Sequence, residues 1–340
     1  MKLRTLGRTG VRVSPLCLGA MMFGQWGEPD HDESIRIINR ALDAGINFID
    51  TADMYSAGES EEIVGKALKG KRDSVVLATK FHGAMSFDPN EQGNSRRWII
   101  KEVENSLRRL QTDYIDLYQV HRPSPETDID DTLSALTELI RSGKVRYIGT
   151  STYPAHEVVE AQFIARERGR ERFVCEQPPY SLLVRGIERD LLPVAQQYGM
   201  GIIPWSPLAG GWLSGKWRKG GTENESRRAA LLPDRYDLSI PDNHRKLDAA
   251  DAFANLADKH GISLVMMAIA FVIRHPAVTS AIIGPRTMEQ LESQLGAADL
   301  DLSEETLDAI DEIVPPGVTL HEADRGYDPP AITDAALRRR

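Results

Sequence analysis

Short apolar runs alternate with longer amphipathic segments along most of the chain. The run Val75-Val-Leu-Ala-Thr-Lys80 is typical of a buried strand because it is apolar, β-branched and too short for a helix. Residues 95–110 and 60–68 instead have a helical period. Each of these two segments begins at a serine, Ser95 and Ser60, which we expect to cap the helix.

The pattern as a whole predicts eight strands, each followed by at least one helix. The expected strands are residues 16–20, 48–50, 75–80, 114–120, 145–149, 173–176, 201–204 and 279–283. The expected helices are residues 32–44, 60–68, 95–110, 129–141, 155–168, 188–198, 246–260, 263–274, 287–296 and 303–313. Strict alternation implies a parallel sheet with crossover helices. Eight units in about 280 residues fit a closed (β/α)₈ TIM barrel, and the absence of G-x-G-x-x-G after the first strand argues against a Rossmann fold.

Four segments lie outside the alternation. Residues 2–13 read as an N-terminal hairpin closed by glycines, and residues 303–313 are an extra C-terminal helix. The stretch 206–244 after strand 7 is too long for a plain connector, so we expect it to be functional or mobile. Residues 315–340 form an irregular tail. We expect residues 1–340 to form a single domain.

Composition narrows the class of protein. The chain has 340 residues, of which 41% are hydrophobic and 27% charged, as in ordinary globular proteins. A net charge of −9 disfavours nucleic acid and acidic membranes as partners. The two cysteines, Cys17 and Cys175, lie in apolar surroundings and suit a reducing compartment. No signal peptide and no apolar run of about 18 residues is visible, so we expect a cytoplasmic protein.

Candidate chemistry gathers at the predicted ends of the strands, where (β/α)₈ barrels place their active sites. Asp50 closes the second strand and Tyr55 follows it, while Lys80 and His121 close two later strands. This set suits reversible proton transfer to a carbonyl oxygen. Lys80 as an ammonium would lower the pKa of Tyr55 from its reference value of about 10, and Asp50 would keep Lys80 charged. A neutral His121 could orient the carbonyl, but a nicotinamide would have to deliver a hydride.

Each of these residues also has an ordinary structural explanation. Tyr55 could be a loop aromatic, Lys80 a solvated cation, His121 a structural histidine and Asp50 the cap of a turn. Four such residues at strand ends of one barrel make the ordinary explanation much less favourable. Asp53 remains open as a solvated loop acid, and we interpret it as a spacer between Asp50 and Tyr55.

These four residues resemble, in order and spacing, the tetrad of the aldo-keto reductases. The resemblance extends over nearly the whole chain through the segments Leu18-Gly-Ala-Met, Phe48-Ile-Asp-Thr-Ala, Gly143-Lys-Val-Arg-Tyr-Ile-Gly149, Gln177-Pro-Pro-Tyr180, Pro204-Trp-Ser-Pro-Leu208 and Ile283-Gly-Pro-Arg-Thr-Met-Glu-Gln290. It is most similar to the bacterial branch that also resembles potassium-channel β subunits.

The resemblance implies a set of cofactor-binding residues. Ser151 and Gln177 would bind the nicotinamide carboxamide and Trp205 would stack on the ring. The pyrophosphate would lie along Ser206, Leu208, Gly210 and Lys216, and the adenosine would lie against Gly284, Arg286, Gln290 and Gln294. A guanidinium at position 286 favours a 2′-phosphate, and therefore NADP(H) over NAD(H). Thr152 departs from the family, which usually has Asn after the serine.

The resulting hypothesis is NADPH-dependent reduction of aldehydes or ketones to alcohols, with Tyr55 as proton donor. The alternative is a regulatory subunit that binds NADP(H), turns over slowly and senses redox state. A metal-dependent hydrolase on the same barrel lacks ligand clusters, so we expect no metal. Met22, Trp26 and Phe81 are candidate substrate contacts, and an apolar lining favours uncharged carbonyl compounds. The physiological substrate and the oligomeric state stay open.

Overall fold

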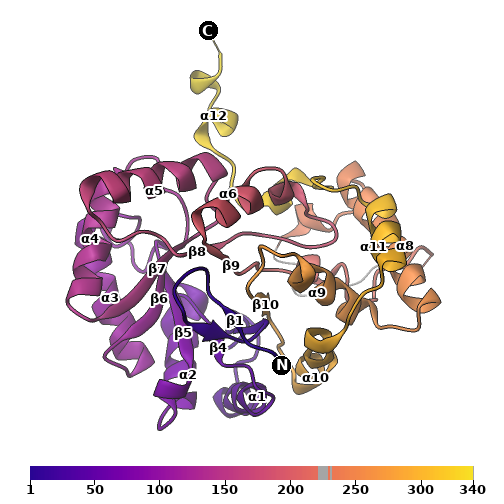
Figure 1. Cartoon of the computed structure of the whole chain (residues 1–340), viewed down its shortest axis with the longest axis horizontal. Coiled ribbons are helices and arrows are strands. Elements are labelled where there is room, and N and C mark those ends of the chain that lie inside the picture. Colours follow the sequence, from indigo (N-terminus) through magenta and orange to yellow (C-terminus); the bar gives the residue numbers. More distant parts are fainter. Residues whose placement is uncertain (221–228, 230–231, 340) are drawn as a thin grey trace.

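The computed structural model describes residues 1–220, 229 and 232–339, and its centre is a barrel of eight parallel strands (Figure 1). The strands are β3 (Leu16–Gly19), β4 (Phe48–Asp50), β5 (Val76–Phe81), β6 (Ile115–Val120), β7 (Val145–Ser151), β8 (Cys175–Gln177), β9 (Gly201–Ile202) and β10 (Ala281–Ile283). Each pairs with the next along the chain from β3 to β9, and β10 pairs with β3. The gap between β9 and β10 is closed by backbone bonds from Thr279 N to Ile202 O and from Ile282 N to Pro204 O, both 2.8 Å. The (β/α)₈ prediction is confirmed.

Helices surround the barrel on the outside (Figure 1). They are α1 (His31–Asp43), α2 (Glu59–Ala67), α3 (Arg96–Leu110), α4 (Ile129–Arg141), α5 (Ala155–Arg168), α6 (Leu191–Tyr198), α8 (Pro241–Lys259), α9 (Leu264–Arg274), α10 (Met288–Leu295), α11 (Glu304–Ile313) and the short α12 (Pro330–Thr333). Helix α11 is the extra C-terminal helix that the sequence predicts. None of the described helices is by itself long and apolar enough to span a membrane, and α8 and α9 meet that criterion only as a pair bent by 98°.

Two boundaries differ from the sequence prediction for local reasons. Helix α8 begins five residues earlier than expected, at Pro241, because proline suits a first helical position that needs no N–H donor. Helix α2 begins at Glu59 without a side-chain cap. Ser60 was wrongly predicted to be that cap, since its hydroxyl donates to Ala20 O at 2.8 Å. The predicted cap at Ser95 is confirmed, because its hydroxyl accepts from Trp98 N at 3.3 Å.

Alternation along each strand separates an inner from an outer apolar layer. In β5, Ala78 belongs to the interior of the barrel, whereas Leu77 and Phe81 belong to the layer beneath the helices. The interior is closed at one end by the antiparallel hairpin of β1 (Arg4–Thr5) and β2 (Arg12–Val13), as Figure 1 shows. Its buried Leu6 and Val13 join the interior cluster. The opposite end, where the strands terminate, is therefore the end available to a ligand.

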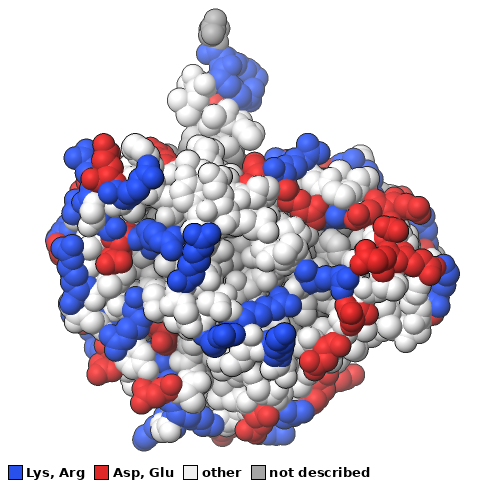
Figure 2. Space-filling view, viewed as in Figure 1, with Lys and Arg blue, Asp and Glu red and all other residues white. Residues whose placement is uncertain are grey.

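The chain beyond α11 returns across the molecule before it leaves the surface. Arg185 N donates to Val318 O and Leu320 N to Leu183 O, at 2.9 and 3.1 Å. The 3₁₀ turn Glu322–Arg325 follows, and α12 then projects away from the barrel (Figure 1). On the face shown in Figure 2, basic and acidic side chains are intermixed around the rim, and neither sign covers the face.

Candidate active site

Polar residues at the C-terminal ends of the strands face the interior because they continue the inward alternation of each strand. Asp50 is the last residue of β4, and Lys80 is two positions after the inward Ala78 of β5. His121 immediately follows β6, and Gln177 is the last residue of β8. The barrel therefore brings together residues that lie up to 127 positions apart in the sequence.

The centre of the site is a fully desolvated ion pair between Lys80 and Asp50. Lys80 has 0% exposure, and its Nζ donates to Asp50 Oδ1 at 2.5 Å and to Thr51 O at 2.8 Å. Asp50 Oδ2 accepts from Gln177 Nε2 at 2.8 Å and from Gln119 Nε2 at 3.1 Å. Lys80 is therefore not a solvated cation, and both carboxylate oxygens of Asp50 accept hydrogen bonds from residues of the site.

The pKa of Lys80 reflects two opposing effects. Burial lowers it, but the charge of Asp50 and the proximity of Tyr55 outweigh burial and raise the pKa above its ordinary value. Lys80 therefore remains an ammonium at neutral pH, held at a fixed place beside the phenol.

Tyr55 lies over this ion pair in a tight turn. Lys80 Nζ donates to Tyr55 Oη at 3.4 Å. Ser56 and Ala57, the next two residues, have positive φ values of 49° and 55°, which is a strained conformation for residues with a Cβ. Such strain persists only where surrounding contacts enforce it, and here it aims the phenol at Lys80.

Burial raises the pKa of Tyr55, and the ammonium of Lys80 opposes this effect without reversing it. The lowering influence of Lys80 is present as expected, but the expected net decrease is wrong because desolvation of the phenolate is larger. The phenol is therefore protonated at neutral pH, the state that a proton donor requires.

His121 is the fourth of the predicted catalytic residues, and it packs against the ring of Tyr55. The two rings meet edge to face, with centroids 5.7 Å apart and planes at 80°. Burial and the nearby charges of Lys80 and Arg122 hold the pKa of His121 well below its ordinary value, so the imidazole is neutral. Its Nδ1 is buried and has no hydrogen-bond partner among the described residues.

The three predicted substrate contacts have different positions. Trp26 is 39% exposed, and its ring centroid lies 6.0 Å from that of Tyr55. Trp26 N donates to Ser56 Oγ at 3.1 Å. Met22 is partly exposed in the same loop. Phe81 has 0% exposure and packs on Tyr118 beneath the helices, because it occupies an outward position of β5. The structure therefore does not bring Phe81 to the site.

The residues predicted to hold the nicotinamide lie beside the ion pair. Ser151 Oγ donates to Gln177 O at 2.9 Å, which joins the ends of β7 and β8. The amide nitrogen of Gln177 is engaged by Asp50, so its side-chain oxygen is the part left to face a ligand. Trp205 is partly exposed, and its Nε1 is buried without a partner among the described residues.

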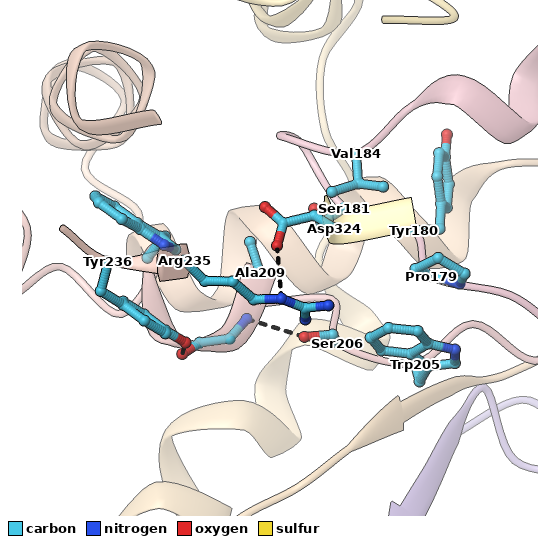
Figure 3. Close-up of a pocket in the computed structure, with 12 residues that line it drawn as sticks. Pro179, Tyr180, Ser181, Val184, Trp205, Ser206, Ala209, Arg235, Tyr236 and Asp324 are labelled. Carbon is cyan, nitrogen blue, oxygen red and sulfur yellow. Dashed lines mark hydrogen bonds and ion pairs between the residues drawn. The ribbon is translucent and has the colours of Figure 1, made fainter. Parts of the chain in front are cut away.

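A pocket continues from Trp205 into the loop after β9. Figure 3 shows the guanidinium of Arg235 extending toward Ser206 and Trp205, with Asp324 of the C-terminal segment on its other side. Gly210 N donates to Ser206 Oγ at 2.9 Å. Leu208 packs against the core, and Lys216 is exposed beyond the pocket. Sequence reasoning missed Arg235, because its place in a long irregular loop carries no positional signal.

The residues predicted for the adenosine lie after β10. Gly284 is exposed, and no atom lies within 4 Å of where a side chain would begin. Arg286 N donates to Gln290 Oε1 at 2.8 Å, and the Arg286 guanidinium forms no ion pair with any described residue. The side-chain oxygen of Gln294 is buried and unpartnered within the described part of the chain. An open glycine fits a nucleotide, as do a guanidinium and a buried amide oxygen that have no partner among the residues the structure describes.

Other chemistry has less support within the described residues. No group of three or more His, Cys, Asp or Glu residues there could hold a metal ion. Asp53 has 0% exposure, so the prediction of a solvated loop acid is wrong. Its Oδ1 accepts from Met54 N at 2.7 Å, and it faces a buried cluster behind the active site.

Comparison with known proteins identifies the class. The model of the Aldo/keto reductase family matches residues 15–315, so the chain belongs to this family of oxidoreductases. Members of the family act on carbonyl compounds with a nicotinamide dinucleotide.

Individual relatives align along almost their full length. An uncharacterized oxidoreductase, YrpG of Bacillus subtilis, is 40% identical over 95% of this chain and 99% of its own length. A putative voltage-gated potassium channel subunit beta of Schizosaccharomyces pombe is 36% identical over 92% of both chains. Versiconal hemiacetal acetate reductase of Aspergillus parasiticus is 34% identical over 92% of this chain and 96% of its own.

Proposed function

We propose that the protein reduces aldehydes or ketones to alcohols with NADPH, and that Tyr55 donates the proton. The observation that supports this most directly is the contact of the Tyr55 hydroxyl with an ammonium that is itself fixed by Asp50. Bound NADPH would supply the hydride.

Each of the four residues has a different role in reduction of the carbonyl. His121, neutral and beside Tyr55, donates a hydrogen bond to the carbonyl oxygen and orients it. Tyr55 gives its proton to that oxygen as negative charge develops there, and Lys80 stabilises the phenolate that remains. Asp50 keeps Lys80 charged and stationary. Asp50, Lys80 and His121 are buried, and the low exposure of their charges and donors strengthens these interactions.

NADPH is favoured over NADH by the adenosine end of the site. Ser151, Gln177 and Trp205 would hold the nicotinamide, and Ser206 and Gly210 would lie along the pyrophosphate. The Arg286 guanidinium, which has no ion-pair partner among the described residues, is available for a 2′-phosphate. In a fluorescence titration, NADPH should bind more tightly than NADH, and Arg286→Ala should remove most of that preference.

Replacement of Tyr55 tests the proton donor. Tyr55→Phe should lower kcat for carbonyl reduction by about 10²- to 10⁴-fold, while NADPH still quenches the protein fluorescence. Tyr118→Phe is the control, because it removes a tyrosine hydroxyl from the same barrel, and the Tyr118 hydroxyl is buried and has no hydrogen-bond partner among the described residues. Near-native turnover by Tyr55→Phe would refute the assigned role.

The relatives named as channel subunits favour one second candidate, a regulatory subunit that binds NADP(H) and turns over slowly. The two candidates differ in which step is slow. Single-turnover oxidation of bound NADPH by an aldehyde, compared with the rate at which NADP⁺ leaves, would separate an efficient reductase from such a sensor.

A further inference from the structure

A guanidinium without a carboxylate partner lies at the mouth of the site. Arg122 follows His121 directly, and its Nη1 donates to His121 O at 2.6 Å and to Thr152 Oγ1 at 3.2 Å. Both acceptors are neutral. Its remaining donors, on Nε and Nη2, form no hydrogen bond with a described residue, and neither does any described carboxylate approach within ion-pair distance of it.

Three other cations near the site, all among the described residues, are paired with carboxylates. Lys80 is bound to Asp50, and both Lys246 and Arg235 face Asp324, at 2.9 and 3.9 Å. Arg122 is partly exposed, unlike Lys80 and Lys246, and the burial of the rest of its side chain lowers its pKa. The charge of Glu176 acts on Arg122 from beyond ion-pair distance. A guanidinium that is partly exposed, and that is hydrogen-bonded only to neutral acceptors, can still bind an anion through its remaining donors.

The surroundings fix Arg122 as part of the site. Thr152, one of its two acceptors, has a φ of 62°, a left-handed conformation that a β-branched residue adopts at a cost. The side chains of Thr152 and Trp205 lie close to each other, because both pack against Gly326. Burial raises the pKa of the Tyr55 phenol, and the charge of Arg122 is near enough to oppose that rise. An anion held by Arg122 would therefore lie close to the group proposed to donate the proton.

We propose that Arg122 binds a carboxylate on the substrate, so that the enzyme prefers carbonyl compounds that carry an acidic group. The proposal rests on the proposed carbonyl reduction and assigns its substrate class. It differs from the uncharged substrates that an apolar lining suggests, because the sequence alone does not reveal that Arg122 lacks a partner. The free Nε and Nη2 donors match the two oxygens of a carboxylate.

Pairs of substrates that differ only in charge test the proposal. The assay compares 2-, 3- and 4-carboxybenzaldehyde, each with its methyl ester, in the wild-type protein. At least one acid should exceed its ester in kcat/KM by about 10-fold or more, mainly through KM. Arg122→Gln should remove most of this ratio, and Arg122→Lys should restore part of it. Arg172→Gln is the matched control, because Arg172 also donates to a backbone carbonyl, Tyr198 O, but lies before β8 at the other end of the barrel.

A measurement on the wild-type protein covers the possibility that Arg122→Gln does not fold. Benzoate should inhibit competitively against a neutral aldehyde, and benzamide at the same concentration should not. Equal kcat/KM for acids and esters, or equal inhibition by benzoate and benzamide, would overturn the proposal. Weaker NADPH binding by Arg122→Gln with an unchanged acid-to-ester ratio would also overturn it, since Arg122 would then serve the cofactor. Failure to reduce any of the compounds would instead count against the proposed function.

Discussion

Two buried charged clusters lie within one loop of each other, and they differ in that one lies inside the barrel at its open end and the other lies behind the barrel wall. The mouth cluster consists of Asp50, Lys80, Gln119 and Gln177 inside the barrel. The sealed cluster consists of Asp53, Glu61, Glu102 and Arg109 between the barrel and helices α2 and α3. Asp50 and Asp53, three residues apart, belong to different clusters.

The sealed cluster has an excess of acid. Arg109 binds Glu61 at 2.6 Å and Glu102 at 2.5 Å, and both glutamates have 0% exposure. Burial and the neighbouring carboxylates raise the pKa of Asp53 well above its ordinary value, so the charged form of Asp53 is disfavoured in the folded protein. Arg109 also packs under Gly58, where a Cβ would meet its Cδ at 2.7 Å, so the cluster supports the turn that carries Tyr55.

Perturbed titration therefore does not by itself identify an active site. Both clusters contain desolvated groups with shifted pKa values. The mouth cluster is adjacent to a phenol and a neutral imidazole at the open end of the barrel, whereas the sealed cluster is enclosed by helices. We expect the mouth cluster to matter chiefly for turnover and the sealed cluster chiefly for stability.

The largest stability effect should come from Arg109→Gln. This change leaves Glu61 and Glu102 buried without a cation, and loss of one partner of a buried ion pair costs about 3–5 kcal/mol. Chemical denaturation measures this loss as a lower free energy of unfolding. Arg108→Gln, on the exposed side of the same helix, should cost less than about 0.5 kcal/mol. Equal stability of the two variants would remove the distinction between the clusters.

The sequence predicted the fold well because a strand–helix repeat is a local signal. Eight short apolar runs with amphipathic segments between them restrict the topology to a barrel, and barrel geometry then brings Asp50, Lys80 and His121 to one end. Phe81 could have been excluded on the same basis, since a residue next to the inward Lys80 must face outward.

Other features depend on contacts between distant segments. Nothing near Asp53 in the sequence shows that α2 and α3 enclose it, and nothing near Arg122 shows that it lacks a carboxylate. Ser60 has the sequence of a helix cap, but its hydroxyl donates to Ala20 O and is hydrogen-bonded to the Thr51 hydroxyl instead. Such outcomes are decided by tertiary neighbours, which local patterns do not encode.

Lys80→Met should mainly reduce turnover, whereas Arg109→Gln should mainly reduce stability. Carbonyl reduction should fall by about 10²-fold or more, because nothing then stabilises the Tyr55 phenolate. The free energy of unfolding should fall by only about 1–3 kcal/mol, since Asp50 keeps the amide donors of Gln119 and Gln177. Lys101→Met, at an exposed ion pair with Glu91, should change neither quantity measurably. A stability loss as large as that of Arg109→Gln would contradict this division.

Glu176 is a buried carboxyl that forms no ion pair with a described residue, so its replacement tests how burial alone makes stability depend on pH. It lies on the outward face of β8 and accepts from Tyr153 N at 3.1 Å, and burial raises its pKa to about 7. The folded protein therefore holds a proton that the unfolded chain has released between about pH 4.5 and 7. Stability should fall across this range by up to about 3 kcal/mol. Glu176→Gln should flatten the fall in melting temperature, and an unchanged pH profile would refute the assignment.

Asp53→Asn should have the smallest effect and makes the sharpest comparison with Asp50. An amide has the shape of a protonated carboxyl and can still accept from Met54 N, so the cost at acidic pH should be within about 1 kcal/mol. The raised pKa of Asp53 means that Asp53 contributes to the loss of stability as the pH rises above the ordinary carboxyl range, and the variant lacks this contribution. The variant should therefore gain stability relative to wild type as the pH rises.

The same pair of aspartates separates the clusters by turnover. Asp50→Asn removes the charge that fixes Lys80 and should reduce kcat strongly, whereas Asp53→Asn should leave kcat nearly unchanged. The reverse result would show that the sealed cluster takes part in turnover.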